Sequence, residues 1–152
     1  DTLREELSQR NMEESRDNLI SIGNSLRSQG GPGVLADLMI KYINTSDNHI
    51  IDSIRNPSEV HSLRRHYSEH KFILISIDAD PKIRFDRLMQ RERKGDSKNW
   101  EQFLEQELLE ENSDDPNKQQ LFNTIKEADF NIDNSGNLAD LEDKLSLIID
   151  NL

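Results

Sequence analysis

The sequence predicts an α/β fold in which a parallel β-sheet is covered by helices on both faces. Residues 72–77 are nearly all apolar, which is typical of a strand buried on both sides, because half-exposed strands alternate apolar and polar residues. Further along the chain, strand-like stretches are followed by segments with apolar residues at helical spacing. A repeated strand-then-helix order favours a parallel sheet, since parallel strands need a crossover connection.

Size and composition limit the classes of function. The 152 residues are enough for one domain with a core, and we expect a single domain over residues 1–152. The net charge of −11 would repel a phosphate backbone, so we expect no nucleic-acid partner. The absence of cysteine excludes disulfides and thiolate sites, and it fits a cytoplasmic protein. The longest apolar run is far too short to cross a bilayer, so we expect no membrane association.

The first part of the chain predicts helices. Residues 3–10 lead into a short helix, and residues 18–28 carry leucine and isoleucine at helical spacing. The glycines and proline of residues 30–33 end this second helix. Residues 34–43 are rich in apolar side chains and predict a buried third helix.

The next segment predicts the first strand and a capped helix. Residues 49–53 place two isoleucines ahead of Asp52, which is a strand signal. Asn56 and Pro57 are typical of an N-cap and a first helical residue, and Glu59 completes a pattern that resembles a capping box.

The second half repeats the strand-helix order. After the strand over residues 72–77, Asp80 and Pro81 begin a helix that leads into a charged stretch. Trp100 and Phe103 mark one side of another helix, and an acidic, turn-rich segment follows it. A short strand over residues 130–132 precedes the last helix. The sequence pattern predicts only three strands, which is fewer than a sheet of this kind usually has. We therefore expect a central strand to be missing from this sequence.

Five motifs occur in an order that is informative as a set. The most specific is IIDSIRNPSEV at residues 50–60. The others are DTLREE at 1–6, SRDNL at 15–19 with GNSLR at 23–27, IDADPKIRFDRLMQRERKGD at 77–96, and FNIDNSGNLADL at 130–141. Together they resemble the motifs of P-loop small-molecule kinases, particularly an archaeal family similar to dephospho-CoA kinases.

The resemblance implies a three-layer sandwich like that of P-loop nucleoside-monophosphate kinases, with a lid over roughly residues 91–115. It implies a transferase that uses ATP and Mg²⁺ and acts on a small phosphorylated acceptor, such as a (deoxy)nucleoside monophosphate or a dephospho-CoA-like molecule. The sequence departs from this family because it contains no G-x-x-x-x-G-K-[ST] phosphate loop. Since the chain opens on Asp1, we expect an N-terminally truncated domain without its first two strands.

The resemblance also assigns roles to individual residues. It implies acceptor binding by Arg4, Arg27 and Arg55. It implies that Arg91 and Arg93 act on the transferring phosphoryl group from the lid, and that Asp52 serves the metal or the acceptor. Asn134 and Gly136 match the turn that packs on adenine.

Each of these residues also has a structural interpretation. A lone arginine is commonly found on a solvated helix face, and Arg55 could pair with Glu59. Asn134 and Gly136 are what many turns require. We interpret Arg84 or Arg87 as part of a solvated helix face, balanced by nearby carboxylates.

Two function hypotheses follow. The first is an ATP-dependent kinase, in which case this chain alone lacks the phosphate loop. The second is a kinase-like nucleotide-binding or regulatory module without catalysis, with fusion to a deoxycytidylate deaminase as one form that similar domains take. No metal site is expected, because His66 and His70 have no third ligand in the pattern.

Overall fold

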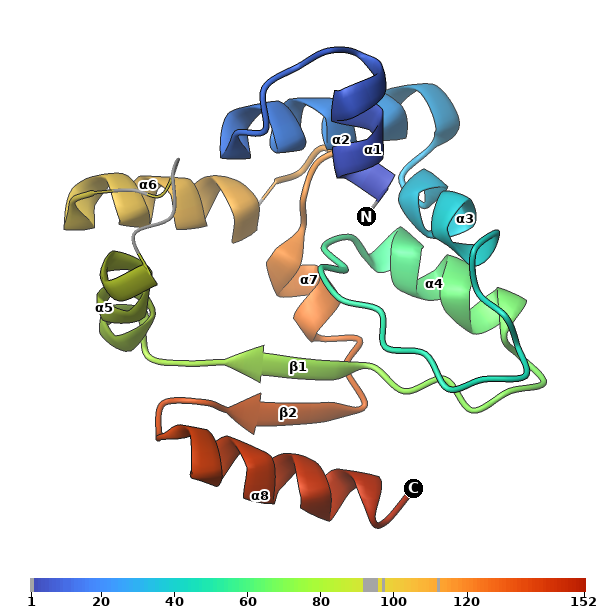
Figure 1. Cartoon of the computed structure of the whole chain (residues 1–152), viewed down its shortest axis with the longest axis vertical. Helices are drawn as coiled ribbons and strands as arrows, with labels where there is room; N and C mark the ends of the chain where they lie inside the picture. Colours follow the sequence, from blue (N-terminus) through green and yellow to red (C-terminus); the bar gives the residue numbers. More distant parts are fainter. Residues whose placement is uncertain (1, 92–95, 97, 112) are drawn as a thin grey trace.

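The computed structural model describes residues 2–91, 96, 98–111 and 113–152, and it has an α/β architecture (Figure 1). Strands β1 (Ile75–Asp78) and β2 (Phe130–Asp133) pair in parallel, with Ile75 opposite Phe130 and Asp78 opposite Asp133. The parallel pairing confirms the prediction for these segments. Within the described residues the sheet consists of these two strands.

The three N-terminal helices are confirmed as α1 (Thr2–Gln9), α2 (Arg16–Gly30) and α3 (Val34–Ile40). Helix α2 begins at Ser15, whose hydroxyl accepts a hydrogen bond from the backbone N–H of Asn18. It ends at Gly31, which has φ of 90° and whose N–H donates to the carbonyl of Arg27. A glycine suits this position because other residues adopt positive φ only with strain.

The predicted strand over residues 49–53 is wrong for this structure. The segment is irregular, Ser53 has φ of 64°, and residue Ile50 is 99% exposed. A strand needs a hydrogen-bonded neighbour, and among the described residues β1 pairs only with β2. Ile51 and Ile54 nevertheless pack against the hydrophobic core, so the apolar signal was correct although the backbone state was not.

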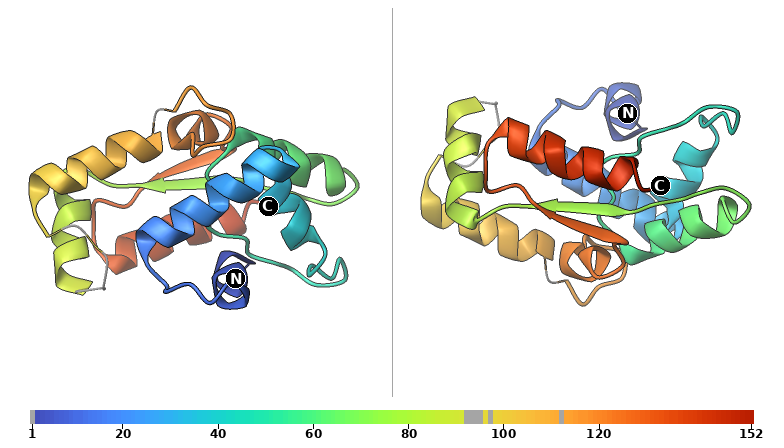
Figure 2. Two further views of the ribbon diagram at one scale, coloured as in Figure 1. Left: turned by 90° about the horizontal axis from the view of Figure 1, so that it is seen from above. Right: turned by 90° about the horizontal axis from the view of Figure 1, so that it is seen from below.

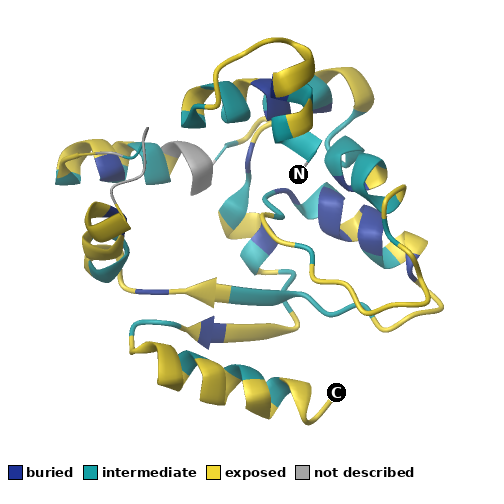
Figure 3. Cartoon of the chain, viewed as in Figure 1, coloured by how far each residue is buried: buried dark blue, intermediate teal, exposed yellow. Residues whose placement is uncertain are grey.

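Helix α4 (Pro57–His66) carries the centre of the core. Leu63 is fully buried and clusters with Ala36 of α3 and with Tyr67. Burial raises the pKa of the Tyr67 hydroxyl. Asn56 caps the helix as predicted, because its side-chain oxygen accepts the N–H of Ser58 at 2.9 Å. The sheet is much less covered than this core, as Figure 3 shows.

The prediction that the strand over residues 72–77 is buried on both faces is also wrong here. Strand β1 begins at Ile75, and Ile77 within it is 51% exposed. The physical reason is that the described sheet has only two strands and that its covering helix, α8 (Leu138–Ile149), packs against β2. No helix of the described residues packs as closely against β1. Figure 1 shows α2 and α8 at opposite ends of the molecule, with the strands between them, and in Figure 2 α2 lies nearer the viewer from above and α8 nearer the viewer from below.

The remaining helices are α5 (Pro81–Arg91), α6 (Trp100–Glu111) and α7 (Leu121–Ile125). An aromatic cluster joins α5 to α6, since the ring of Phe85 lies 5.4 Å from the rings of both Trp100 and Phe103. Helix α7 is not apparent from the sequence pattern, because it is short and its N-cap position, Gln120, makes no side-chain cap. No helix in the described part of the chain is both long enough and apolar enough for a membrane span.

Candidate functional site

A cavity of about 780 Å³ lies between the N-terminal helices and the segment over residues 50–55. This volume is within the range of small-molecule sites. Its lining includes five of the residues that the sequence singled out: Arg4, Arg27, Asp52, Arg55 and Arg91. These residues come from α1, α2, the irregular segment before α4 and the end of α5, so the fold brings together positions that are far apart in the sequence.

The charged lining of the cavity is balanced. Among the described residues, its arginines are Arg4, Arg16, Arg27, Arg55 and Arg91, and its carboxylates are Glu5, Glu14, Asp52, Glu59 and Asp96. The chain as a whole has a net charge of −11, so the cavity is far less acidic than the rest of the molecule. A local group of arginines of this kind is suited to an anion, although the average field of the protein is not.

A buried ion pair forms one wall of the cavity. The guanidinium of Arg27 donates to Oε1 of Glu59 through Nη2 at 2.7 Å and through Nε at 3.1 Å. The two side chains are only 4% and 5% exposed. The other oxygen of Glu59 accepts the backbone N–H of Arg55 at 2.9 Å. Glu59 therefore joins α2, α4 and the segment before α4.

This arrangement corrects two interpretations. The carboxylate of Glu59 accepts the N–H of Arg55 rather than that of the N-cap residue, so the predicted capping box is wrong. The predicted side-chain pair of Arg55 with Glu59 is replaced by the pair with Arg27, which reaches the carboxylate from α2. The guanidinium of Arg55 instead donates to Oε1 of Gln119 at 3.2 Å.

The segment after α6 is attached to the same turn. Asn56 is 1% exposed, and its side-chain nitrogen donates to the carbonyls of Pro116 at 2.8 Å and Lys118 at 2.9 Å. The backbone N–H of Gln120 donates to the carbonyl of Arg55 at 2.9 Å. These hydrogen bonds hold the cavity wall at Arg55 against the segment that follows α6.

Two ion pairs with more accessible arginines also lie at the cavity. Nε of Arg4 lies 2.7 Å from a carboxylate oxygen of Glu14, and both side chains are about half exposed. Arg91 binds both oxygens of Asp96, with its Nε at 2.7 Å and its Nη2 at 3.0 Å. The hydrogen bond to Asp96 raises the pKa of Arg91. Arg93 lies outside the described residues.

Asp52 lines the cavity for a different reason from the one predicted. The sequence placed it at the carboxyl end of a strand, but the segment is irregular and Asp52 is exposed. It reaches the cavity because Ile51 and Ile54 on either side are held against the core.

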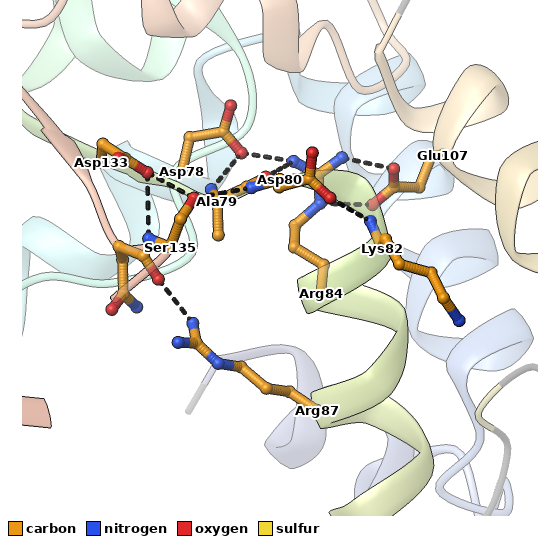
Figure 4. A network of polar contacts seen from close by, with 10 residues as sticks. Asp78, Ala79, Asp80, Lys82, Arg84, Arg87, Glu107, Asp133 and Ser135 are labelled. Carbon is orange, nitrogen blue, oxygen red and sulfur yellow. Dashed lines mark hydrogen bonds and ion pairs between the residues drawn. The ribbon is translucent and has the colours of Figure 1, made fainter. Parts of the chain in front are cut away.

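Asn134 and Gly136 lie in a separate region, at the carboxyl end of β2. Arg87 donates from Nη1 to the carbonyl of Asn134 at 2.7 Å and from Nη2 to that of Gly136 at 2.6 Å. Asp133 accepts hydrogen bonds from the hydroxyl and the N–H of Ser135, and these bonds lower its pKa. Figure 4 shows how the side chain of Arg87 reaches this turn from α5.

The interpretation of Arg84 or Arg87 as part of a solvated face is wrong for Arg84, whereas Arg87 is exposed on α5 and only its guanidinium is held, by the turn after β2. Arg84 pairs with Asp78 at the end of β1 and with Glu107 of α6, and it also donates to the carbonyl of Ala79 at 2.6 Å. The hydrogen bond to Glu107 is the main reason that the pKa of Arg84 is raised. Together with Asp78 and Asp133, it lines a second hollow of about 550 Å³. Both arginines connect α5 to neighbouring elements.

The sequence pattern did not identify three residues of the first cavity: Glu14, Glu59 as the partner of Arg27, and Asp96. Each is an acidic residue in a chain rich in them, so only the three-dimensional pairing distinguishes them from surface carboxylates. In the described part of the chain, no group of three or more His, Asp or Glu side chains is placed to hold a metal ion.

Comparison with known proteins gives a family. No family model matches the sequence. The UPF0200 protein of Methanococcus maripaludis is 32% identical, and the match covers 98% of this chain and 81% of that protein. The UPF0200 protein of Methanocaldococcus jannaschii is 36% identical over 72% of this chain and 56% of its own length. The chain spans 61% and 62% of the length of the relatives from Pyrococcus horikoshii and Pyrococcus furiosus. On this similarity, the chain belongs to the UPF0200 family.

Proposed function

We propose that the whole protein is an ATP-dependent phosphotransferase of the P-loop kinase type, and that the cavity of about 780 Å³ receives its small phosphorylated acceptor. The observation that carries this proposal is the convergence of Arg4, Arg27, Arg55 and Arg91 on one cavity from separate segments. Scattered surface arginines would not share a concave site.

The chemistry of phosphoryl transfer matches this lining. Two anions must be brought together, and the charge on the transferring group must be neutralised by cations. Arg4 and Arg55 hold the acceptor phosphate in this account, and Arg91 reaches the transferring group from the end of α5. Arg27 is 3% exposed and its charge is paired with Glu59, so it forms the wall of the site and is assigned no contact with the phosphate. Asp52 faces the acceptor.

ATP and Mg²⁺ are assigned to the whole protein and not to these residues alone. The resemblance assigns the turn at Asn134 and Gly136 to the adenine end of ATP, but the 152 residues contain no phosphate loop. We therefore assign no step of transfer through ATP or Mg²⁺ to this chain. By itself, it is expected to bind the acceptor without phosphorylating it, which is the binding activity of the second hypothesis.

The proposed fold is the three-layer sandwich with a further strand beside β1. The exposure of Ile50 and Ile77 supports it, since parallel sheets are normally covered on both faces. An additional strand between residues 49–53 and β1 would give both segments a partner. An experimental structure of a full-length UPF0200 relative tests this directly: a strand is expected there, and direct pairing of the two segments would contradict the proposal.

Calorimetric titration of the chain tests the acceptor site. The ligands are adenosine 5′-monophosphate (AMP), deoxycytidine 5′-monophosphate and dephospho-CoA, each compared with its nucleoside or dephosphorylated form. We expect at least one phosphorylated ligand to bind, and Arg4→Met and Arg55→Met each to weaken it about tenfold or more, since a charge-assisted hydrogen bond is lost.

The matched control is Arg65→Met, which removes the same charge from an exposed position of α4 outside the cavity. It should leave the affinity nearly unchanged. Equal losses in all three variants, or equal binding of the ligands without phosphate, would show that the cavity arginines do not recognise phosphate.

A further inference from the structure

The accessible arginines of the cavity already hold carboxylates in the place where a ligand would put its phosphate. Arg4 binds Glu14, and Arg91 binds Asp96 through two hydrogen bonds. Two parallel N–H···O bonds from one guanidinium are also the geometry with which arginine binds phosphate. A bound phosphate oxygen and these carboxylates therefore require the same donors.

Among the described residues, the ion pairs Arg27–Glu59, Arg4–Glu14 and Arg91–Asp96 differ in how easily they can be exchanged. Both side chains of the Arg27–Glu59 pair are about 95% buried, and Glu59 also accepts the N–H of Arg55. Separating that pair would leave a buried charge without compensation, which is strongly unfavourable. The side chains of Arg4 and Glu14 are 40% and 52% exposed, and exposed ion pairs contribute only about 0–1 kcal/mol. In the other pair Arg91 is 54% exposed and Asp96 is 11% exposed, so this pair is open to solvent on its arginine side, where a ligand can approach.

From these contacts we infer that Glu14 and Asp96 are internal competitors of the acceptor: they occupy Arg4 and Arg91 in the free protein and are displaced when an anion binds. The inference rests on the proposed function and adds a form of regulation to the same site. Such competition explains how a cavity with balanced charge can bind an anion. When the phosphate binds Arg4 and Arg91, the carboxylates of Glu14 and Asp96 leave these arginines, so the two guanidinium groups become available to the ligand. Weak anions with one charge gain little from this exchange, which favours ligands with a dianionic phosphate.

The inference predicts an effect opposite to that of a ligand-binding residue. Glu14→Gln should tighten AMP binding about two- to fivefold, because it removes an exposed competitor worth up to about 1 kcal/mol. Asp96→Asn should tighten AMP binding as well, because it removes the other competitor. Adenosine, which lacks the phosphate, should bind equally to all variants. Glu142→Gln, an exposed change in α8, is the charge-matched control and should have no effect.

A double-mutant cycle separates competition from simple repulsion of the ligand by a carboxylate. In the Arg91→Met background, Asp96→Asn should no longer tighten AMP binding, because the guanidinium for which Asp96 and the phosphate compete has been removed. Tightening that persists there would show repulsion and overturn the inference. Weaker or unchanged AMP binding in Glu14→Gln and Asp96→Asn would also overturn the inference. If Arg4→Met and Arg55→Met still lost AMP binding in that case, the proposal that the cavity is the acceptor site would stand. Absence of AMP binding in every variant would reject AMP as the acceptor and the competition with it.

Discussion

Replacing Glu59 with alanine is expected to destabilise the chain by about 3–5 kcal/mol, because it leaves the guanidinium of Arg27 buried without a counter-charge. The change also removes the acceptor for the N–H of Arg55, which releases the segment that forms the cavity wall. Urea denaturation followed by circular dichroism measures the free energy of unfolding. Glu142→Ala, at an exposed site of α8, is the control and should change it by less than about 0.5 kcal/mol.

Two further variants identify the cause. Glu59→Gln keeps an oxygen for the Arg55 N–H but removes the charge, so its cost reports the ion pair alone. The double change Arg27→Met with Glu59→Leu removes both charges, and replacement of a buried pair by apolar side chains is commonly neutral or stabilising. A double variant as unstable as Glu59→Ala would show that the pair is not the source of the loss.

Replacing Asn56 with alanine is expected to cost about 2–4 kcal/mol. About 1 kcal/mol comes from the lost cap of α4, and the rest comes from the carbonyls of Pro116 and Lys118, which lose their donor. Amide hydrogen exchange at Gln120 should become faster, because that amide bonds to the adjoining Arg55 carbonyl. The measurement pairs denaturation with exchange detected by mass spectrometry.

Asn56→Ser distinguishes the two contributions. Serine also caps helices with its side-chain oxygen and adds no charge, but it lacks the amide nitrogen that donates to the two carbonyls, so stability should fall less than in Asn56→Ala while exchange at Gln120 still increases. Asn123→Ala, an exposed change in α7, serves as the control. If exchange at Gln120 stayed at the wild-type rate in both variants, Asn56 would not anchor the segment after α6.

Local signals allowed most helices to be predicted. The N-cap at Asn56, the proline after it and the glycines after α2 act within a few residues, so the sequence contains their whole physical basis. The strand at residues 49–53 was wrong because a strand depends on a neighbour that the pattern cannot supply. The same dependence explains why β1 is half exposed although its sequence is typical of a buried strand.

The candidate site was predictable in its residues but not in its pairings. Motif order brought out Arg4, Arg55 and Arg91, and all three line the cavity. The pair of Arg27 with Glu59 spans 32 positions and depends on how α2 packs against α4, so no local pattern reveals it. The same applies to Arg87, whose contact with the carbonyl of Asn134 joins segments 47 positions apart.

The claim that the cavity binds a phosphorylated molecule is tested most directly by nuclear magnetic resonance of the ¹⁵N-labelled chain titrated with AMP, with adenosine as the reference. The account predicts phosphate-dependent shifts of the backbone amides in α1, at the start of α2 and in residues 50–55, with saturation at one site. Shifts that adenosine reproduces, or shifts confined to the turn at Asn134 and to α8, would contradict it.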